Sequence, residues 1–538
     1  MPCQGRPAAL RTERWYDVFE VASPGAGRRR RDALRRRRVG RVIMSPLEVA
    51  LLGLYFLVLV ILAVFGLHRY VMVYLYFRHR DRRALPAPPP ERLPRVTVQL
   101  PLYNEMYVVD RLLESVTRIR HPRELLEIQV LDDSTDETNA IARAAVARYR
   151  EQGFDIHYLH RDERTGFKAG ALEAGLALAK GEFVLIFDAD FVAPPDILEK
   201  TLGHFSDPAV GMVQVRWGHI NRDYSLLTQV QSILLDGHFI LEHGGRNRAG
   251  RFFNFNGTAG VWRRETIADA GGWQHDTLTE DLDLSYRAQL KGWRFVFVQD
   301  VVAPAEIPVE MNAFKSQQHR WAKGSIQTCK KLLPRILAST LPLPIKLEAA
   351  FHLTANFAYP LMVLLALLMF PAMVIRYNMG WYEMMLVDVP LFLGATMSVC
   401  SFYLMSQREV FGDAWRARIK YLPAVLAAGI GLSVNNAKAV LEALLGFESG
   451  FTRTPKLGVE ATGEDWKHKR YRGRLSFVPF VELLLGIYFT LMAYYALSSE
   501  IYGTLPFILL FQFGFLYAAT LSLFQDVGKL LLVRTQEA

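Results

Sequence analysis

Two adjacent carboxylates, Asp132 and Asp133, end an apolar, β-branched run of the sequence. Such a pair can accept hydrogen bonds from a nucleobase N–H and from ribose hydroxyls. Ser134, followed three residues later by Glu137, fits a capping box and predicts that a helix begins there. Capping does not require the two aspartates, so we expect them to bind a ligand. Glu105 also follows an apolar run, although alone it is only part of a polar turn.

A second pair of acids, Asp188 and Asp190, comes directly after the run EFVLIF. Two carboxylates at this spacing can converge on a divalent cation and a diphosphate, and hard oxygen ligands favour Mg²⁺ or Mn²⁺. The tripeptide DxD is common by chance, so its position after a predicted buried strand carries the prediction. Lys168 opens a predicted helix in the segment GFKAG and can meet a diphosphate there, or can simply be a solvated lysine.

Thr279, Glu280 and Asp281 begin another predicted helix. Thr279 can cap this helix, and the two acids can complement its dipole. At a helix start beside a cleft, Asp281 can equally act as a general base. Both interpretations stay open from these residues alone.

The segment QQHRWAKG holds a set of side chains with a common direction. In a helix, Gln317, Arg320 and Trp321 share one face. Arginine offers a two-pronged contact to phosphate, and tryptophan offers a flat surface on which a sugar ring can stack. The alternative, an amphipathic helix lying on a membrane, is compatible with this function.

Short apolar runs recur roughly every 30 residues along the middle of the chain, with helical patterns between them. They lie at 95–100, 125–131, 154–159, 182–188 and 210–216. This spacing predicts strand–helix–strand units and a parallel sheet. Ligands of such sheets bind at the carboxyl ends of the strands, which is where the acidic residues lie.

Five stretches without Asp, Glu, Lys or Arg are long enough to cross a membrane, since roughly 17–25 residues suffice. They are 49–67, 349–375, 389–407, 483–499 and 501–525. Buried core helices are the alternative, but four such runs beyond residue 348 disfavour it. The basic flank 78–83 places the soluble region in the cytoplasm. We interpret 422–447 as interfacial, because a crossing there would put the basic residues of 453–474 outside.

The composition excludes several classes of protein. The chain has 538 residues, is 51% hydrophobic and contains three cysteines, which excludes disorder, collagen and small disulfide scaffolds. Its formal net charge is +10, but residues 1–43 hold twelve arginines against four acidic residues, a net charge of +8. The remaining charge therefore predicts no nucleic-acid partner. Met44 begins a sequence typical of membrane proteins, and we expect translation to start there, with 1–43 as an extension of the gene model.

Together, these motifs resemble the family 2 inverting glycosyltransferases of the cellulose synthase-like group, nearest to its A branch of mannan and glucomannan synthases. The resemblance covers about 95–460 and rests on the ordered set of paired aspartates, DAD, TED and QxxRW; the segments 225–239 and 253–264 are also similar. It implies a GT-A-like α/β nucleotide-diphospho-sugar transferase with a mixed, mainly parallel sheet, inserted among transmembrane helices.

The resemblance also implies a role for each matching residue. The residues implied to hold the nucleoside are Glu105, Asp132 and Asp133. Those implied to meet the diphosphate, the nucleotide and the metal are Lys168, Asp188, Asp190, Gln317 and Arg320. Asp281, beside Glu280, would deprotonate the acceptor, on which Trp321 would stack. Asn256 resembles the start of an acceptor-facing helix, and Phe451, Thr454 and Lys456 resemble a gating loop over the nucleotide.

The implied activity is transfer of hexosyl units from UDP-glucose or GDP-mannose to a growing β-linked polysaccharide, with Mg²⁺ or Mn²⁺ and with translocation of the chain. The acceptor is a glycan or a lipid, because a ceramide glucosyltransferase-like enzyme that adds a single sugar is the second candidate. A non-catalytic scaffold or transporter is the third. The dense arginine usage and the single N-terminal span favour a bacterial inner membrane over the Golgi.

These expectations divide the chain into seven units. They are a tail at 1–43, a membrane helix at 44–80, a cytoplasmic transferase domain at 90–345, two membrane helices at 346–408, an interfacial segment with the gating loop at 409–476, two membrane helices at 477–525 and a cytoplasmic tail at 526–538.

Overall fold

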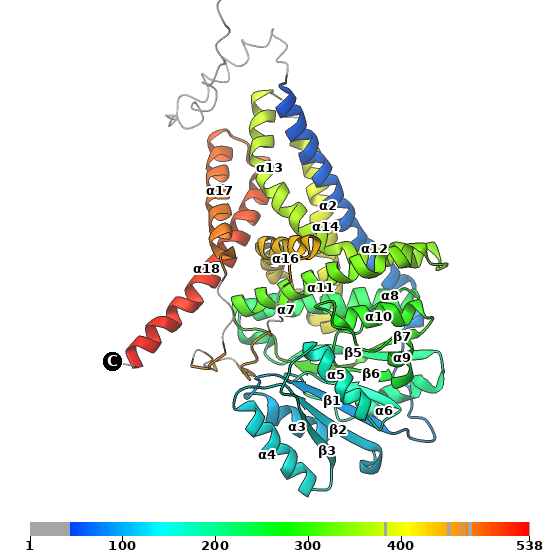
Figure 1. Ribbon diagram of the computed structural model, residues 1–538. Helices are drawn as coiled ribbons and strands as arrows, with labels where there is room; N and C mark the ends of the chain where they lie inside the picture. The colour runs from blue at the N-terminus through cyan, green and yellow to red at the C-terminus, as the bar shows by residue number, and fades with distance from the viewer. Residues whose placement is uncertain are drawn as a thin grey trace, which may run out of the picture.

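A computed structural model describes residues 44–538 apart from 381–384, 449–452, 462, 465, 467, 472–475 and 537–538. The predicted tail at 1–43 and the predicted site residue Phe451 lie outside the described residues. Figure 1 shows two parts, a sheet with its covering helices and a bundle of long helices.

The lower part is built on a seven-stranded sheet of order β3-β2-β1-β4-β6-β5-β7. The strands are β1 Val96–Leu102, β2 Leu126–Asp132, β3 Asp155–His160, β4 Phe183–Ile186, β5 Val210–His219, β6 Gly260–Arg263 and β7 Arg294–Ala305. Only β6 runs antiparallel, to both β4 and β5; the other neighbouring pairs are parallel. The predicted mixed, mainly parallel sheet is therefore confirmed, and the first five strands lie at the predicted runs.

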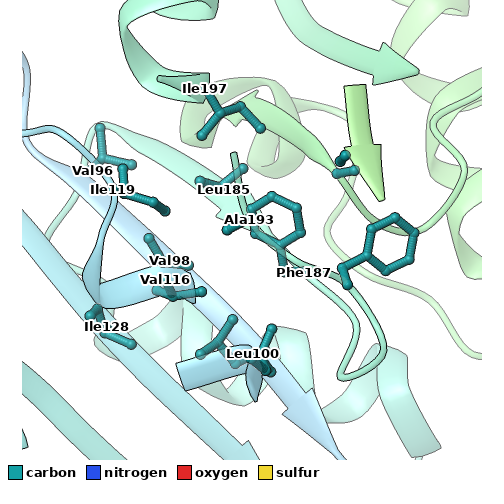
Figure 2. Packing of buried hydrophobic residues seen from close by; sticks show 14 of the residues in the cluster. Val96, Val98, Leu100, Val116, Ile119, Ile128, Leu185, Phe187, Ala193 and Ile197 are labelled. Carbon is teal, nitrogen blue, oxygen red and sulfur yellow. The ribbon is translucent and has the colours of Figure 1, made fainter. Parts of the chain in front are cut away.

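Helices cover both faces of this sheet (Figure 1). They are α3 Val109–Thr117, α4 Thr138–Glu151, α5 Phe167–Leu178, α6 Ile197–Thr201, α7 Leu226–Gly237, α8 Gly244–Arg248, α9 Arg264–Asp269 and α10 Glu280–Leu290, with a π-helix at His238–His243. Alternate residues of β1, Val96, Val98 and Leu100, are fully buried and meet Val116 and Ile119 from the α3 side (Figure 2). A strand buried on both faces explains why the predicted runs are almost continuously apolar.

The predicted capping box at Ser134 and Glu137 is wrong. Glu137 occupies the N-cap position of α4, and its side chain makes no capping hydrogen bond. The Ser134 hydroxyl instead accepts from the Asn104 amide at 2.8 Å, which ties the loop after β2 to the loop after β1. This long-range contact takes the place of the local cap.

The upper part contains long apolar helices. They are α2 Pro46–Arg78, α13 Ala358–Asn378, α14 Met385–Phe411, α17 Val478–Ser498 and α18 Leu505–Gln536. Five segments of the described chain are long and apolar enough to cross a membrane: Pro46–Arg78, Leu343–Asn378, Pro390–Leu445, Val478–Ser498 and Tyr502–Gln525. Their number agrees with the five predicted spans.

Three helices lie crosswise between the bundle and the sheet, α11 Met311–Ala338, α12 Leu343–Thr354 and α16 Ser433–Leu445 (Figure 1). The segment predicted to be interfacial is broken at Leu432 into α15 Leu422–Gly431 and α16. Helix α16 packs on α11, where Ile326 contacts Val440 and Ala443. The crosswise layer therefore joins the bundle to the seven-stranded sheet through α11.

Candidate active site

One cleft opens at the carboxyl ends of β1, β2, β4 and β5. The loop before β6, the start of α10, one side of α11 and the segment 453–456 complete its walls. The predicted site residues that line it are Glu105, Asp133, Lys168, Asp188, Asp190, Asn256, Glu280, Asp281, Gln317, Arg320, Trp321, Thr454 and Lys456. Parts of the chain more than 300 residues apart in sequence therefore meet in one place.

Asp132 is the predicted ligand that does not line this cleft. Its side chain is fully buried and accepts from the Ser134 amide at 2.9 Å and from the Tyr158 hydroxyl at 2.6 Å. Asp132 therefore holds the turn after β2, and its neighbour Asp133 faces the cleft.

The Asp133 carboxylate forms a two-pronged ion pair with Arg161, at 2.8 Å from Nε to Oδ1 and 2.5 Å from Nη2 to Oδ2. The same guanidinium donates to the carbonyls of Thr165 and Phe167, and so holds the turn that begins α5. Arg164 from this turn lies 3.4 Å above the ring of Tyr103, which also lines the cleft. A flat cationic and aromatic surface thus borders the Asp133 side.

Lys168 bridges two walls of the cleft. Its ammonium donates to Asp188 Oδ1 at 2.5 Å and to the Gly257 carbonyl at 2.9 Å. Burial opposes the charged form, but the Asp188 and Glu280 carboxylates prevail and raise the pKa of Lys168. The alternative prediction, that Lys168 is a solvated surface lysine, is therefore wrong. The lysine lies at the start of α5, and its ammonium lies among carboxylates.

Asp281 lies in the first turn of α10, close to Gly257. A Cβ added at Gly257 would lie 3.1 Å from Asp281 Oδ2 and 3.3 Å from Lys168 Nζ, and the φ of this glycine is +79°. The backbone therefore reaches the carboxylate only because residue 257 has no side chain. Burial and the adjacent Glu280 carboxylate raise the pKa of Asp281 to about 7, although Lys168 opposes the shift. Burial also raises the pKa of Glu280.

The start of α10 lies directly against α11. Thr279 occupies the N-cap position but makes no capping hydrogen bond, and its hydroxyl lies 3.3 Å from that of Thr328. A Cβ added at Gly324 would meet the Thr279 side chain at 2.5 Å and its amide nitrogen at 2.8 Å. Gly324 therefore allows α11 to approach Asp281 while Gln317, Arg320 and Trp321 face the same cleft.

Asn256 was predicted at the start of a helix, but it lies in the loop before β6. The helices that begin at the cleft are α5 and α10, and neither contains Asn256. The Asn256 amide donates to His238 Nε2 at 2.9 Å, and His238 Nδ1 lies 2.8 Å from Glu242. Because the Glu242 carboxylate can only accept, His238 donates to it, and Asn256 Oδ1 remains a buried acceptor without a partner among the described residues.

Asp190 is held by a residue from the far end of the chain. Lys456 donates to Asp190 Oδ2 at 2.5 Å, whereas Asp190 Oδ1 is buried without a partner in the described part of the chain. Burial raises the pKa of the nearby Glu105 to about 7, against the positive charges of Arg453 and Lys456. Lys456 thus lies at the cleft wall beside two acidic residues, Asp190 and Glu105.

The segment that carries Lys456 is anchored on the sheet domain. The amides of Leu457 and Gly458 donate to the two oxygens of the Glu306 carboxylate at 3.0 and 2.9 Å. Farther along, the Tyr471 hydroxyl donates to Asp136. These contacts hold Thr454 and Lys456 at the cleft.

Asp188 and Asp190 fit a divalent cation only in part. No group of three or more His, Cys, Asp or Glu side chains among the described residues can hold a metal ion. The buried, unpartnered Asp190 Oδ1 and the half-exposed Asp188 provide two hard oxygen ligands. The other ligands would have to come from a bound diphosphate and water, which is how Mg²⁺ usually binds.

Several residues that line the cleft were not predicted from the sequence, because none of them belongs to the ordered set of motifs. They are Tyr103, Arg164, Trp217, His219, Glu306 and Arg453. Position alone offers a signal for Trp217 and His219, since they follow the predicted run at 210–216 as the aspartates follow theirs. Arg161, which binds Asp133, follows the predicted run at 154–159 in the same way.

Residues 94–324 match the family described as "Glycosyltransferase like family 2". The chain is also similar to "Glucomannan 4-beta-mannosyltransferase 1" of Oryza sativa subsp. japonica, with 41% identity over 275 residues. That match covers 48% of this chain and 52% of the relative, so the chain spans about half the length of the curated relative.

Two solved structures are similar over most of their length. One is a mannosyltransferase from Pyrobaculum calidifontis in complex with GDP-Man and Mn²⁺, with 22% identity and a TM-score of 0.46; the match covers 72% of this chain and 100% of that one. The other is S. aureus TarS 1–349 in complex with UDP-GlcNAc, with 17% identity and a TM-score of 0.33, covering 65% and 92% of the two chains.

Proposed function

Since residues 94–324 form a family 2 glycosyltransferase domain, we propose that the protein is a membrane-embedded inverting hexosyltransferase. It transfers a hexosyl unit from a nucleotide sugar to a hydroxyl at the end of a β-linked glycan. One observation carries this proposal: Asp281, the Asp188 and Asp190 pair, and Arg320 come from three distant segments and line one cleft.

The nucleoside would lie between the ends of β1 and β2. Asp133 and Glu105 provide acceptors there, and the stacked Arg164 and Tyr103 offer a flat surface for a base. Arg161 fixes the orientation of the Asp133 carboxylate by a two-pronged ion pair. Asp132 contributes indirectly, by holding the turn.

The diphosphate would lie between β4 and α11. Arg320, Lys168 and Lys456 supply positive charge on three sides, and Gln317 adds an amide. Asp188 and Asp190 would hold Mg²⁺ or Mn²⁺ together with diphosphate oxygens. When bound, the cation would stabilise the charge that develops on the leaving diphosphate.

Asp281 is the proposed base. It takes the proton of the acceptor hydroxyl while that oxygen forms a bond to the anomeric carbon and the bond from this carbon to the diphosphate breaks. A pKa of about 7 suits a carboxylate that must accept a proton near neutral pH. A single displacement inverts the anomeric centre, so an α-linked donor gives a β-linked product.

The acceptor would lie on the opposite side of Asp281 from the diphosphate. Trp321 offers its ring as a stacking surface, and Asn256 offers a buried carbonyl oxygen to a sugar hydroxyl. The relative named a glucomannan 4-beta-mannosyltransferase supports mannose as the first donor sugar to test, with glucose as the second.

The contacts of the segment 453–471 indicate on which side of the membrane it lies. Its contacts with Asp190 and Glu306 require it to lie on the same side of the membrane as the transferase domain. An even number of crossings must therefore separate α11 from residue 453. If α13 and α14 cross, α15 and α16 together do not, which supports an interfacial position for 422–447 and, with the positive-inside rule, a cytoplasmic domain.

Cysteine labelling tests this topology in intact cells. An impermeant thiol reagent should label Asn378→Cys from outside and should label Glu460→Cys only after permeabilisation. Labelling of both positions from outside would contradict the arrangement. The same test applies in a bacterial inner membrane, which we favour as the location.

Membranes containing the protein, incubated with radiolabelled GDP-mannose or UDP-glucose, test the proposed activity. We expect label in a product that stays at the chromatographic origin, because a processive enzyme extends one chain repeatedly. Label that is instead extracted as a single-sugar glycolipid would favour the second candidate, an enzyme that adds one sugar to a lipid. No transfer from either donor would contradict the proposal.

A further inference from the structure

Besides Asp190 and Asn256, two cleft residues on β5 each have a buried polar atom without a hydrogen-bond partner among the described residues, Trp217 Nε1 and His219 Nδ1. Both residues belong to β5, two positions apart, so their side chains leave the same face of the strand. Both also line the cleft. Buried polar groups are nearly always hydrogen-bonded in native proteins. Two neighbouring nitrogen atoms without partners in a cleft therefore indicate that a bound ligand supplies the partner.

The position of His219 is set by a buried carboxylate. His219 Nε2 lies 3.2 Å from Asp236 Oδ1, and both side chains are about 1% exposed. Asp236 also accepts from Arg222 Nη1 at 2.9 Å and from Gln407 Nε2 at 3.0 Å. Four elements, β5, the turn at Arg222–Tyr224, α7 and α14, therefore fix one imidazole ring.

This arrangement determines which ring nitrogen carries the proton. Although burial opposes ionisation, the contacts of Asp236 with His219 and Arg222 hold its pKa well below the usual value, so it is an acceptor only. Burial lowers the pKa of His219, although Asp236 opposes the shift, while the Arg222 and Arg216 charges lower it further. The ring is therefore neutral, with hydrogen on Nε2 and a lone pair on Nδ1.

Trp217 supplies the complementary group. Its indole N–H can only donate. The ring is held by edge contact with Phe191 at 5.2 Å and by Phe239 at 5.1 Å between ring centroids. Phe191 directly follows Asp190, so the indole lies beside the proposed diphosphate and metal site.

We propose that Trp217 and His219 form a subsite for one sugar hydroxyl, which accepts from Trp217 Nε1 and donates to His219 Nδ1. A hydroxyl is the group that does both at once, and a hexose presents several. The subsite rests on the proposed hexosyl transfer and adds to it a determinant of sugar specificity. Its position beside Asp190 suits the hexose next to the diphosphate; an acceptor hexose offers the same chemistry.

The proposed contact can be tested by combining substrates that lack one hydroxyl with protein variants that lack one of the two hydrogen-bonding groups, at Trp217 or His219. The probes are nucleotide hexoses lacking one ring hydroxyl at a time and oligosaccharide acceptors lacking one at their terminal sugar. We expect one deoxygenation to lower kcat/KM of the wild-type protein about tenfold, because the two hydrogen bonds to that hydroxyl, each of modest net strength, are lost together. If the loss of kcat/KM occurs with a deoxygenated donor, the subsite binds the donor sugar. If it occurs with a deoxygenated acceptor, the subsite binds the acceptor sugar.

Two histidine variants separate binding from structure. In His219→Gln the amide nitrogen can replace Nε2 and keep the Asp236 contact, but the Nδ1 acceptor is lost. In His219→Asn the side-chain oxygen can replace Nδ1, and the Asp236 contact is lost. We expect the penalty for the one sensitive deoxygenation to shrink to about twofold in His219→Gln and to persist in His219→Asn.

Trp217→Phe is an independent variant that removes the N–H together with the five-membered part of the indole and keeps one aromatic ring at this position; it should also shrink the penalty. His204, whose Nε2 is likewise buried without a partner in the described chain but lies outside the cleft, provides the control His204→Gln, which should leave every penalty unchanged.

Equal penalties in wild type and His219→Gln, or a shrunken penalty in His219→Asn, would overturn the subsite while leaving hexosyl transfer intact. Absence of transfer by the wild-type protein would overturn the proposed function itself.

Discussion

Lys456 and Asp190 are 266 residues apart in sequence, yet the lysine ammonium lies 2.5 Å from the Asp190 carboxylate. The segment between α16 and α17 thus reaches the acid that would bind the metal. Because Asp190 Oδ2 is already paired and Oδ1 is not among the described residues, a cation could approach Asp190 at Oδ1 while Lys456 stays beside the proposed diphosphate site.

Removing this ammonium should weaken binding of the nucleotide. We expect Lys456→Met to raise KM for the donor about tenfold to a hundredfold, since hydrogen bonds to charged groups are worth roughly 1.5–3 kcal/mol. Lys330→Met, which loses a lysine of α11 that contacts the Ala443 carbonyl away from the cleft, is the matched control and should leave KM unchanged. Unchanged KM in Lys456→Met would contradict the proposed role.

Asp281→Asn should abolish most transfer without preventing donor binding. Loss of a general base typically costs about 10²–10⁴ in rate, and the amide keeps the size and the buried environment of the carboxyl. Asp276→Asn, in the loop before α10, exposed and paired with Lys331, is the control. Initial rates at saturating donor check this, and a rate within a few fold of wild type would remove Asp281 from the mechanism.

The pH dependence should depend on Glu280. Asp281 acts as a base only when ionised, and its pKa is raised to about 7, so kcat/KM should fall as the pH drops below about 7. The Glu280 charge contributes to this shift, and Glu280→Gln should therefore move the acidic limb of the profile to lower pH. A limb that stays in place, or moves to higher pH, would contradict the coupling of the two acids.

Chelation should stop the reaction reversibly. Treatment with EDTA should abolish transfer, and Mg²⁺ or Mn²⁺ should restore it, because two carboxylates alone leave a cation bound mainly through the diphosphate. Asp190→Asn should need a higher concentration of the cation for half-maximal rate. Full activity in EDTA would show that the lysines and Arg320 suffice to stabilise the diphosphate.

Much of this arrangement could be predicted from the sequence because buried parallel strands leave continuous apolar runs. The runs at β1 to β5 identified the strand ends, and most of the acids predicted at these ends line the cleft, namely Glu105, Asp133, Asp188 and Asp190. Strand β6 was not predicted, because it has only four residues, Gly260 to Arg263, and no long apolar run marks it in the sequence. Its antiparallel pairing nevertheless carries Asn256 and Gly257 to the cleft.

The errors at single residues have a common physical origin. Ser134 and Thr279 fit local capping patterns, but each hydroxyl lies against a residue on another element, Asn104 or Thr328. Asp132 was expected in the cleft, yet Tyr158 on the neighbouring strand binds it in the interior. Such choices between a local and a distant partner depend on strand order and register, which local patterns do not specify.

The most direct measurement is the product made from a radiolabelled nucleotide hexose by membranes containing the wild-type protein or Asp281→Asn. Linkage analysis and digestion with β-specific glycosidases identify the new bond. We predict a β-linked hexosyl product from the wild-type protein and almost none from Asp281→Asn at equal protein levels. An α-linked product, or equal product from both proteins, would contradict inverting transfer at this cleft.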